Sequence, residues 1–173
     1  MLLMEIKTIE SYISKIPDYP KPGILFYDIS TLINDAKAFS ASIKLLSQAI
    51  QNYNFNMIAA IDARGFLFGS AIAFHLKKGL VMVRKKNKLP GKKMSYKYEL
   101  EYGTDTLELN IDAKGKKFLI VDDLLATGGT AAATIELLKK AGGEPICLLT
   151  LIELSFLNGK EKIYIPTETL IKY

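Results

Sequence analysis

The chain has almost no cysteine or histidine. Among its 173 residues, Cys147 is the only cysteine and His75 the only histidine. One cysteine cannot form an internal disulfide, and nothing in the sequence argues for secretion. The absence of a His/Cys cluster makes a metal ion held tightly by the protein unexpected. We interpret Cys147, in an apolar run, as a buried filler and His75, in the middle of a predicted helix, as a half-buried structural residue.

Targeting and membrane-spanning segments are also missing. Residues 1–5 are too few, and too soon acidic, for a signal peptide, and no apolar run approaches the length that crosses a membrane. The sequence contains no internal repeat and no low-complexity segment. We therefore expect a soluble cytoplasmic protein whose residues 1–173 form a single domain.

What the chain does carry is an ordinary globular composition with a modest positive charge. Apolar residues make up 49%, charged residues 24%, and the net charge is +5. Much of this charge lies in residues 84–97, a segment that would attract either a polyphosphate or a nucleic acid. Its basic residues are Arg84, Lys85, Lys86, Lys88, Lys92, Lys93 and Lys97.

The most informative segment is residues 118–130, FLIVDDLLATGGT. The apolar run 118–121 predicts a buried strand, and Asp122 and Asp123 are expected at its carboxyl end, where ligands bind in open α/β sheets. Neighbouring residues on a strand point in opposite directions. One carboxylate can therefore accept hydrogen bonds from a ribose diol while the other faces a different partner.

The loop that follows is suited to an oxyanion. Its residues are small enough for backbone N–H groups to approach a phosphate closely, and its threonines add hydroxyl donors. The residues concerned are Ala126, Thr127, Gly128, Gly129 and Thr130. Thr130 is also a candidate helix cap. The loop lacks the spacing of a Walker P-loop. We predict a site for a phosphorylated ribose; the alternative is a strand that ends in a polar turn before a capped helix.

Strand-like and helix-like patterns alternate along the chain, which predicts an α/β sheet of parallel strands with helices on both faces. The strands are expected at 57–61, 80–83, 118–121 and 144–152. One helix is expected after a cap at Asn34 or Asp35, with Phe39, Ile43, Leu46 and Ile50 on one face, a second at 66–76, and a third from Gly129 to the stop at Gly142 and Gly143.

Two segments break this alternation. Residues 16–29 contain three prolines and Gly23, which predicts an extended cover. Residues 85–95 are polar and basic and lead into a predicted hairpin, 96–102 and 106–111, with its turn at Gly103, Thr104 and Asp105. A long excursion of this kind between core strands is often a mobile lid over a site. The alternative is a solvated surface loop.

These motifs together resemble the type I phosphoribosyltransferase family. Residues 121–130, VDDLLATGGT, are similar to the motif with which the family binds phosphoribosyl pyrophosphate (PRPP). Residues 17–26, 63–69, 83–91 and 100–104 resemble the members that act on adenine, in the expected order. The resemblance implies the type I phosphoribosyltransferase fold, which has a central, mainly parallel sheet with helices on both faces. It also implies a hood segment over residues 1–30 and a flexible lid loop and hairpin over residues 85–111.

The resemblance also implies an activity: transfer of the 5-phosphoribosyl group of PRPP to adenine, giving AMP and pyrophosphate in purine salvage. Such a transfer passes through an oxocarbenium-like state, so positioning and stabilisation of the departing pyrophosphate matter most. Mg²⁺ is the expected cofactor, bound mainly through PRPP oxygens and not directly by the protein. A homodimer is implied, and neither a membrane nor a nucleic acid is an expected partner.

The first candidate for the pyrophosphate is Arg64, which follows a buried strand and is expected at the same sheet edge as Asp122. A guanidinium can hold phosphate oxygens in bidentate fashion. The alternative is an arginine that pairs with Asp62 at a turn. By resemblance, residues 62–65, including Ala63, form the pyrophosphate loop. Also by resemblance, Arg84, Lys85 and Lys88 contact the same group. We interpret Lys86, Lys92 and Lys93 as a solvated face.

Base recognition is predicted from the resemblance alone. It places Leu25, Phe26 and Tyr27 beside the purine, with Phe26 stacking on it, and makes Leu154 an apolar wall of the pocket. The family commonly has arginine where this chain has Tyr27, so a guanidinium contact to the base is lost here. Taken without the family, Phe26 is equally well explained as a core residue.

Glu101 is the predicted catalytic carboxylate, together with Arg64. A desolvated glutamate with a raised pKa can protonate or hydrogen-bond N7 of the base as it adds to the ribose. The alternative is an exposed strand glutamate opposite Lys97. Two alternatives to the activity also remain: the same transfer to guanine, hypoxanthine or xanthine, and a regulator that senses PRPP and binds nucleic acid.

Overall fold

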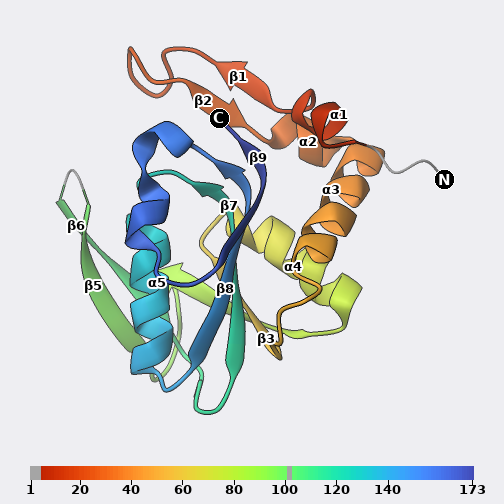
Figure 1. Ribbon diagram of the computed structural model, residues 1–173. Helices are drawn as coiled ribbons and strands as arrows, with labels where there is room; N and C mark the ends of the chain where they lie inside the picture. The colour runs from red at the N-terminus through yellow and green to blue at the C-terminus, as the bar shows by residue number, and fades with distance from the viewer. Residues whose placement is uncertain (1–4, 101–102) are drawn as a thin grey trace. The chain divides into compact units, whose positions relative to one another are not determined.

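The structure, a computed structural model, describes residues 5–100 and 103–173, apart from the side chain of Leu100. The chain divides into two compact units, Met1–Leu45 and Leu46–Tyr173. Figure 1 shows the ribbon with its helices and strands labelled. Of the described helices, none combines the length and the apolar character needed to cross a membrane.

The first unit is built around a small antiparallel ribbon. Its elements are α1 (Ile6–Glu10), β1 (Ser14–Ile16), β2 (Phe26–Asp28), α2 (Ser30–Asn34) and the first part of α3 (Ala36–Ala49). β1 pairs with β2, and the proline-containing segment between them forms turns and bends and no helix. The two ends of residues 16–29 are therefore extended as predicted, and the role of a cover stays a prediction. Asp35 is the cap of α3, because its Oδ1 accepts hydrogen bonds from the backbone N–H groups of Lys37 at 3.0 Å and Ala38 at 2.8 Å.

The second unit contains a seven-stranded sheet with the order β5-β6-β4-β3-β7-β8-β9. Its strands are β3 (Met57–Ile61), β4 (Gly79–Lys85), β5 (Met94–Leu100), β6 (Gly103–Leu109), β7 (Lys117–Leu125), β8 (Glu144–Glu153) and β9 (Thr167–Lys172). Along the sheet, β4, β3, β7, β8 and β9 pair with their neighbours in parallel. At one edge β6 pairs antiparallel with β4, and β5 pairs antiparallel with β6. The mainly parallel sheet that the sequence predicts is confirmed.

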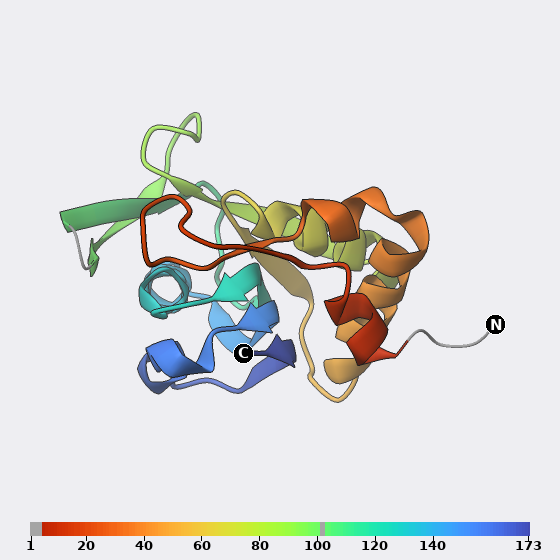
Figure 2. The same ribbon diagram turned by 90° about the horizontal axis from the view of Figure 1, so that it is seen from above.

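Helices α4 (Gly65–Leu76) and α5 (Gly129–Lys140) cover opposite faces of this sheet (Figures 1 and 2). Side chains on β3 alternate between the two faces of the sheet, so each helix packs against a different set of them. Ala59 and Ile61 belong to the buried cluster that includes residues of α5. Ala60, between them, meets α4, where a Cβ on Gly69 would lie 2.6 Å from the Ala60 Cβ. Two short 3₁₀ turns, η1 (Ser155–Leu157) and η2 (Gly159–Lys162), follow β8.

Of the predictions for the single cysteine and the single histidine, one is confirmed and the other is wrong. Cys147 is buried, as predicted, and burial raises the pKa of its thiol to about 12. His75 is exposed near the end of α4, so its prediction as a half-buried residue is wrong. The apolar stripe of α4 explains the difference, because Phe68 and Ile72 face the sheet and His75 does not.

Strand β7 is longer than predicted. Its pairing with β3 ends at Val121, but its pairing with β8 continues from Asp122, opposite Thr150, to Leu125, opposite Glu153. Asp122 and Asp123 therefore lie within the strand and not after its end. They still lie beyond the last residue of β7 that pairs with β3, which is the position that matters for a site at this edge.

The hairpin forms at a different place from the one predicted. Leu100 pairs with Gly103, and Tyr98 pairs with Asp105, so Gly103, Thr104 and Asp105 belong to β6 and do not form the turn. The second strand of the hairpin therefore begins at Gly103 and not at residue 106 as predicted. Residues 101 and 102, between the strands, lie outside the described part of the chain.

Candidate active site

The turn between β7 and α5 has the local structure of an anion site. Gly128 has a left-handed conformation (φ 78°) and is the N-cap residue of α5, and no side chain caps the helix. The prediction that Thr130 caps the helix is therefore wrong. Gly128 makes the left-handed turn that starts the helix, which places Thr130 inside the first helical turn. The N-terminus of α5 keeps N–H groups and a positive dipole end for a ligand.

A hollow of about 90 Å³ lies at this turn. The predicted residues of the phosphate loop come together around it, along with one of the two carboxylates. The lining consists of Asp122, Leu124, Leu125, Ala126, Thr127, Gly128, Gly129, Thr130, Ala131 and Thr150. Thr150, from β8, is a lining residue that sequence reasoning missed, because only the pairing of β8 with β7 brings it here.

Glycines hold this turn in place by close packing. A Cβ on Gly128 would lie 2.2 Å from the Gly159 carbonyl oxygen, and a Cβ on Gly159 would lie 2.0 Å from the Ala126 carbonyl oxygen. At the other side of β7, a Cβ on Gly65 would lie 2.8 Å from the Val121 carbonyl oxygen. Sequence reasoning missed Gly159. Its only local signal is the Asn158-Gly159 pair, which is typical of a turn but says nothing of a ligand.

Asp122 and Asp123 point to different partners, as strand alternation predicts. Asp122 lines the hollow, whereas Asp123 is buried and its Oδ2 lies 2.9 Å from Nε of Arg64. This ion pair confirms that Arg64 and the carboxylates share one sheet edge. Burial raises the pKa of Asp122 well above its usual range, and the Asp123 charge adds to the effect. Burial also raises the pKa of Asp123, while the Arg64 guanidinium opposes that rise.

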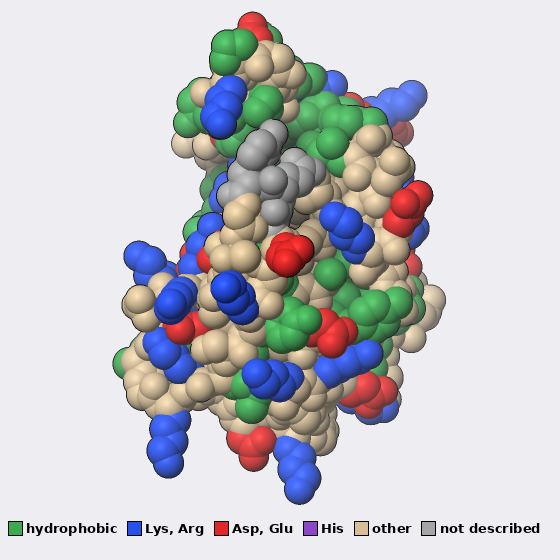
Figure 3. Space-filling view, turned by 90° about the vertical axis from the view of Figure 1, so that its left-hand side faces the viewer, with side chains coloured by type: hydrophobic (Ala, Val, Ile, Leu, Met, Phe, Trp, Pro, Cys, Tyr) green, Lys and Arg blue, Asp and Glu red, His purple; other side chains and the backbone are tan. Residues whose placement is uncertain are grey.

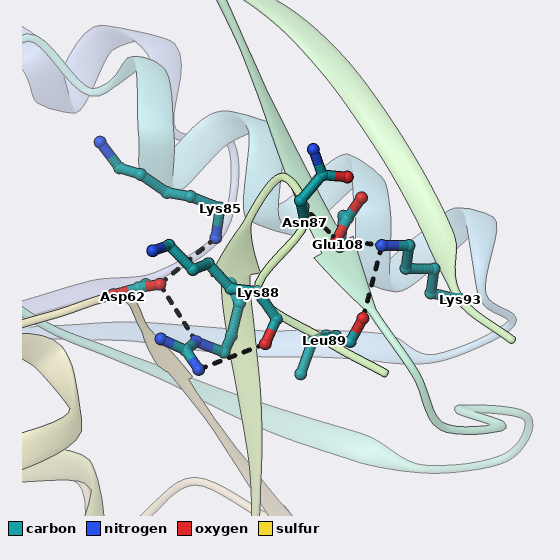
Figure 4. A network of polar contacts seen from close by, with 8 residues as sticks. Asp62, Lys85, Asn87, Lys88, Leu89, Lys93 and Glu108 are labelled. Carbon is teal, nitrogen blue, oxygen red and sulfur yellow. Dashed lines mark hydrogen bonds and ion pairs between the residues drawn. The ribbon is translucent and has the colours of Figure 1, made fainter. Parts of the chain in front are cut away.

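A second group of charges surrounds the loop after β3. Asp62 Oδ2 lies 3.1 Å from Arg84 Nε and accepts a hydrogen bond from the Lys85 backbone N–H at 3.4 Å, so Arg84, and not Arg64, is the described ion-pair partner of Asp62. Arg84 also donates to the Lys88 carbonyl oxygen at 3.4 Å. Figure 4 shows Asp62 with the hydrogen bond that it accepts from the Lys85 backbone. The peptide bond between Asp62 and Ala63 is cis.

Lys93 is exposed, as predicted for a solvated face, but it also has a buried partner. Its Nζ lies 2.9 Å from Oε2 of Glu108, a carboxylate that is nearly fully buried (Figure 4). Glu108 also accepts a hydrogen bond from the Asn87 backbone N–H at 3.0 Å. A buried carboxylate needs partners of this kind, so Lys93 is drawn onto β6. This pair anchors the segment between β4 and β5.

The structure gives the surroundings of the residues predicted to bind the base, and their roles stay predictions. In the first unit, Leu25 is exposed, Phe26 is half-buried with its ring 5.1 Å from that of Tyr19, and Tyr27 is buried. In the second unit, Leu154 is buried and its N–H donates to the Leu125 carbonyl oxygen at 2.9 Å. Glu101 lies outside the described residues, so its role stays a prediction.

Comparison with known proteins connects this site to a family. Residues 30–165 match the phosphoribosyl transferase domain family. The adenine phosphoribosyltransferase of Rhodospirillum centenum is 47% identical over 167 residues, covering 95% of this chain and 98% of its own. The crystal structure of the adenine phosphoribosyltransferase of Thermoanaerobacter pseudethanolicus superposes with a TM-score of 0.94 and 48% identity, covering 97% of this chain and 99% of its own. That of the Saccharomyces cerevisiae enzyme, complexed with adenine and an imino-altritol bisphosphate, has a TM-score of 0.89 and 35% identity, covering 95% and 97%.

Proposed function

The chain belongs to the phosphoribosyltransferase family, and we propose that the edge formed by β3, β7 and the start of α5 is the active site with which it acts. The reaction is the transfer of the 5-phosphoribosyl group of PRPP to adenine, which gives AMP and pyrophosphate. One observation carries the assignment of the site. The hollow at the N-terminus of α5 has a carboxylate in its wall, and the ion pair of Arg64 with the next carboxylate adjoins it.

We assign the sugar and its 5′-phosphate to the β7–α5 turn. The small residues from Ala126 to Gly129 and the Thr127 and Thr130 hydroxyls offer donors to a phosphate. Asp122, in the wall of the same hollow, accepts hydrogen bonds from the ribose diol. Asp123 holds Arg64 in place through their 2.9 Å ion pair, so a change at Asp123 acts on the pyrophosphate end of PRPP.

We assign the pyrophosphate to Arg64, Ala63, Arg84, Lys85 and Lys88. Three of these cations pair with carboxylates: Arg64 with Asp123 at 2.9 Å, Arg84 with Asp62 at 3.1 Å and Lys85 with Asp105 at 3.4 Å. Pyrophosphate carries more charge than one carboxylate and offers oxygens for bidentate contacts, so it can compete for these cations. Their role in the reaction is to hold the leaving group in line and to stabilise the charge that develops on it.

Mg²⁺ fits this site as a partner of the substrate. The described residues contain no group of three or more His, Cys, Asp or Glu side chains that could hold a metal ion. Mg²⁺ takes waters and phosphate oxygens with only one or two carboxylates, and the Asp122 carboxylate in the wall of the hollow suits that ligand set. When bound with PRPP, the ion would neutralise charge on the departing pyrophosphate.

We propose that the base lies against Leu25, Phe26, Tyr27 and Leu154 and that Glu101 acts on its N7. These roles come from the family resemblance. Tyr27 is the position to test first, because the family commonly has arginine there. A Tyr27→Arg variant that leaves the KM for adenine unchanged would remove this side chain from recognition.

A turnover panel of free bases tests the function. Purified protein with PRPP and Mg²⁺ should form AMP from adenine with a kcat/KM at least about tenfold above that for guanine, hypoxanthine or xanthine, a difference of about 1.4 kcal/mol. A better 6-oxopurine substrate would contradict the assignment to adenine.

The arrangement of the charged side chains does not favour the alternative function, a regulator that senses PRPP and binds nucleic acid. On the face that Figure 3 shows, Lys and Arg side chains stand among acidic and apolar ones. Arg84, Lys85 and Lys93, from the basic segment, each pair with a carboxylate. A segment whose cations are held by carboxylates around one site is better suited to a compact polyphosphate than to a nucleic-acid backbone.

We further propose a homodimer that pairs through α4 and β4. Large apolar side chains are exposed on both elements: Leu67 and Phe74 on α4, and Leu80 and Met82 on β4, with Phe74 88% exposed. Exposed apolar clusters of this kind mark interaction surfaces. Phe74→Glu should shift the mass measured by light scattering from a dimer to a monomer, and an unchanged dimer would place the interface elsewhere.

A further inference from the structure

Tyr98 connects the hairpin strand β5 to the phosphate loop. Its ring is buried in the cluster that includes Ala131, Ala133 and Ile135 of α5. Its hydroxyl lies 3.4 Å from Oγ1 of Thr130, which lines the hollow at the β7–α5 turn. The chain thus carries a tyrosine hydroxyl directly behind one of the hydroxyls assigned to the 5′-phosphate. Nothing in the motif 121–130 indicates this residue, because β5 is distant from it in the sequence.

The surroundings of Tyr98 keep its hydroxyl protonated. Burial is the main cause that raises its pKa, whereas the Thr130 hydrogen bond lowers it. The charges of Asp105 and Asp122 also raise the pKa, and that of Lys85 lowers it. These groups come from β6, β7 and β4, so Tyr98 lies among charged residues on three strands. Because its pKa is raised above the ordinary value of a phenol, the Tyr98 hydroxyl keeps its proton near neutral pH and can donate a hydrogen bond.

The direction of the hydrogen bond follows from what a phosphate can do. Either hydroxyl could donate in the ligand-free protein. A phosphate monoester near neutral pH presents acceptor oxygens, so Thr130 must give its single proton to the phosphate. Oγ1 of Thr130 is then left with lone pairs only, and Tyr98 is the hydroxyl placed to donate to them.

We propose that Tyr98 is a positioning residue for phosphate binding, which donates to Thr130 so that the Thr130 proton faces the 5′-phosphate of PRPP and AMP. This inference rests on the proposed assignment of the 5′-phosphate to the β7–α5 turn. The separation of 3.4 Å is longer than an ordinary O–H···O hydrogen bond, and it shortens when an anion polarises Thr130. The gain is orientational, because a fixed hydroxyl loses less entropy when the ligand binds.

The test compares Tyr98→Phe with Tyr96→Phe. Both changes remove one hydroxyl from β5. Both side chains line a second hollow beside α5, separate from the one at the β7–α5 turn, but only Tyr98 reaches Thr130. Titration calorimetry should show AMP binding about three- to tenfold weaker for Tyr98→Phe, the range for loss of one neutral hydrogen bond. Adenine, which has no phosphate, should bind both variants as it binds the wild type.

Steady-state kinetics give a second readout that a purely structural role would not produce. The KM for PRPP should rise in Tyr98→Phe by a similar factor while kcat and the KM for adenine hold. In a Thr130→Val background, Tyr98→Phe should have no further effect on AMP binding.

Three outcomes separate the possibilities. If Tyr98→Phe binds AMP as Tyr96→Phe does, the positioning role is wrong and the proposed function stands. If Tyr98→Phe weakens adenine and AMP equally, the residue is structural and the inference is again wrong. A wild-type protein that binds adenine but not AMP or PRPP would instead contradict the proposed function, and this inference with it.

Discussion

The two sides of the site are organised by different physical means. The β7–α5 turn is held by close backbone packing among Ala126, Gly128 and Gly159, and its ligand groups are small side chains and the helix start. The pyrophosphate side includes three long cations that carboxylates hold: Arg64 by Asp123, Arg84 by Asp62 and Lys85 by Asp105. One side is closely packed, and the other must exchange ion pairs when the substrate binds.

This difference predicts how each side responds to change. A packed turn tolerates no added atoms but is insensitive to salt, because its donors are dipoles at close range. A set of partly exposed ion pairs tolerates small changes of shape but depends on charge and ionic strength. Steric variants should therefore damage the phosphate side most, and charge variants should damage the pyrophosphate side.

Gly128→Ala is expected to have the largest effect. Gly128 is left-handed, and the new Cβ would lie 2.2 Å from the Gly159 carbonyl oxygen, so the turn must move. We expect AMP binding to fall by about a hundredfold or more, since the loop loses its geometry toward the phosphate. Calorimetric titration measures this.

The matched control for that variant is Gly115→Ala. Gly115 is also left-handed (φ 71°), but open space surrounds its position. It should lose about 1–2 kcal/mol of stability from backbone strain alone and keep its AMP affinity. Equal AMP affinities in the two variants would show that the turn is not held by packing.

Asp123→Asn tests the link between the two sides. The neutral amide keeps the shape of the side chain but removes the charge that holds Arg64 at 2.9 Å. PRPP affinity should fall about 10- to 100-fold, the range for a charge-assisted hydrogen bond, with adenine binding unchanged. Wild-type PRPP affinity in equilibrium titration would remove Asp123 from the site.

Glu108→Gln tests whether the ion pair of Glu108 with Lys93 anchors the segment between β4 and β5. Glu108 is buried and its carboxylate pairs with Lys93 at 2.9 Å. The variant should lose about 2 kcal/mol of unfolding free energy in urea, somewhat less than for a fully buried pair because Lys93 is partly exposed. Glu144→Gln, which breaks the exposed pair with Lys117, should change it by less than about 0.5 kcal/mol. Equal losses would contradict the anchoring role.

Asp122→Asn should stabilise the ligand-free protein slightly, and only above acid pH. A carboxyl whose pKa is higher in the folded than in the unfolded state costs nothing below its unfolded value of about 4, and its cost grows as the pH rises toward the folded value. Burial raises the pKa of Asp122 in this way. The melting temperature should rise by about 2–4 °C at pH 7, as for about 1 kcal/mol, and not at pH 4.

The exposed Asp112 provides the control for that measurement, since Asp112→Asn should leave the melting temperature unchanged at both pH values. A gain for Asp122→Asn that is equal at pH 4 and pH 7 would mean that the carboxylate charge is not its cause.

Much of the fold was predictable because local patterns determine it. Apolar runs gave β3 and β8, and helical spacing with Gly142 and Gly143 gave α5. What the sequence could not supply depends on pairing between distant segments. The extension of β7 follows from its partner β8, and the hairpin register follows from β6. The ion pair of Lys93 follows from the burial of Glu108.

The candidate site divides in the same way. Asp122, Asp123 and the loop 126–130 were recognisable because they are contiguous and share one chemistry. Gly159, Thr150 and Tyr98 were missed because each reaches the turn from another element and carries no local signal of a ligand. Thr130 was predicted as a cap because its type favours that position, but Gly128 starts the helix. Residue type alone cannot distinguish these two outcomes.

The most direct test is a crystal structure of the protein with AMP bound. The account predicts that the phosphate lies in the hollow at the β7–α5 turn, with the backbone N–H groups of residues 126–130 as donors and the ribose diol on Asp122. A phosphate found instead among Arg84, Lys85 and Lys88, with that turn empty, would contradict it.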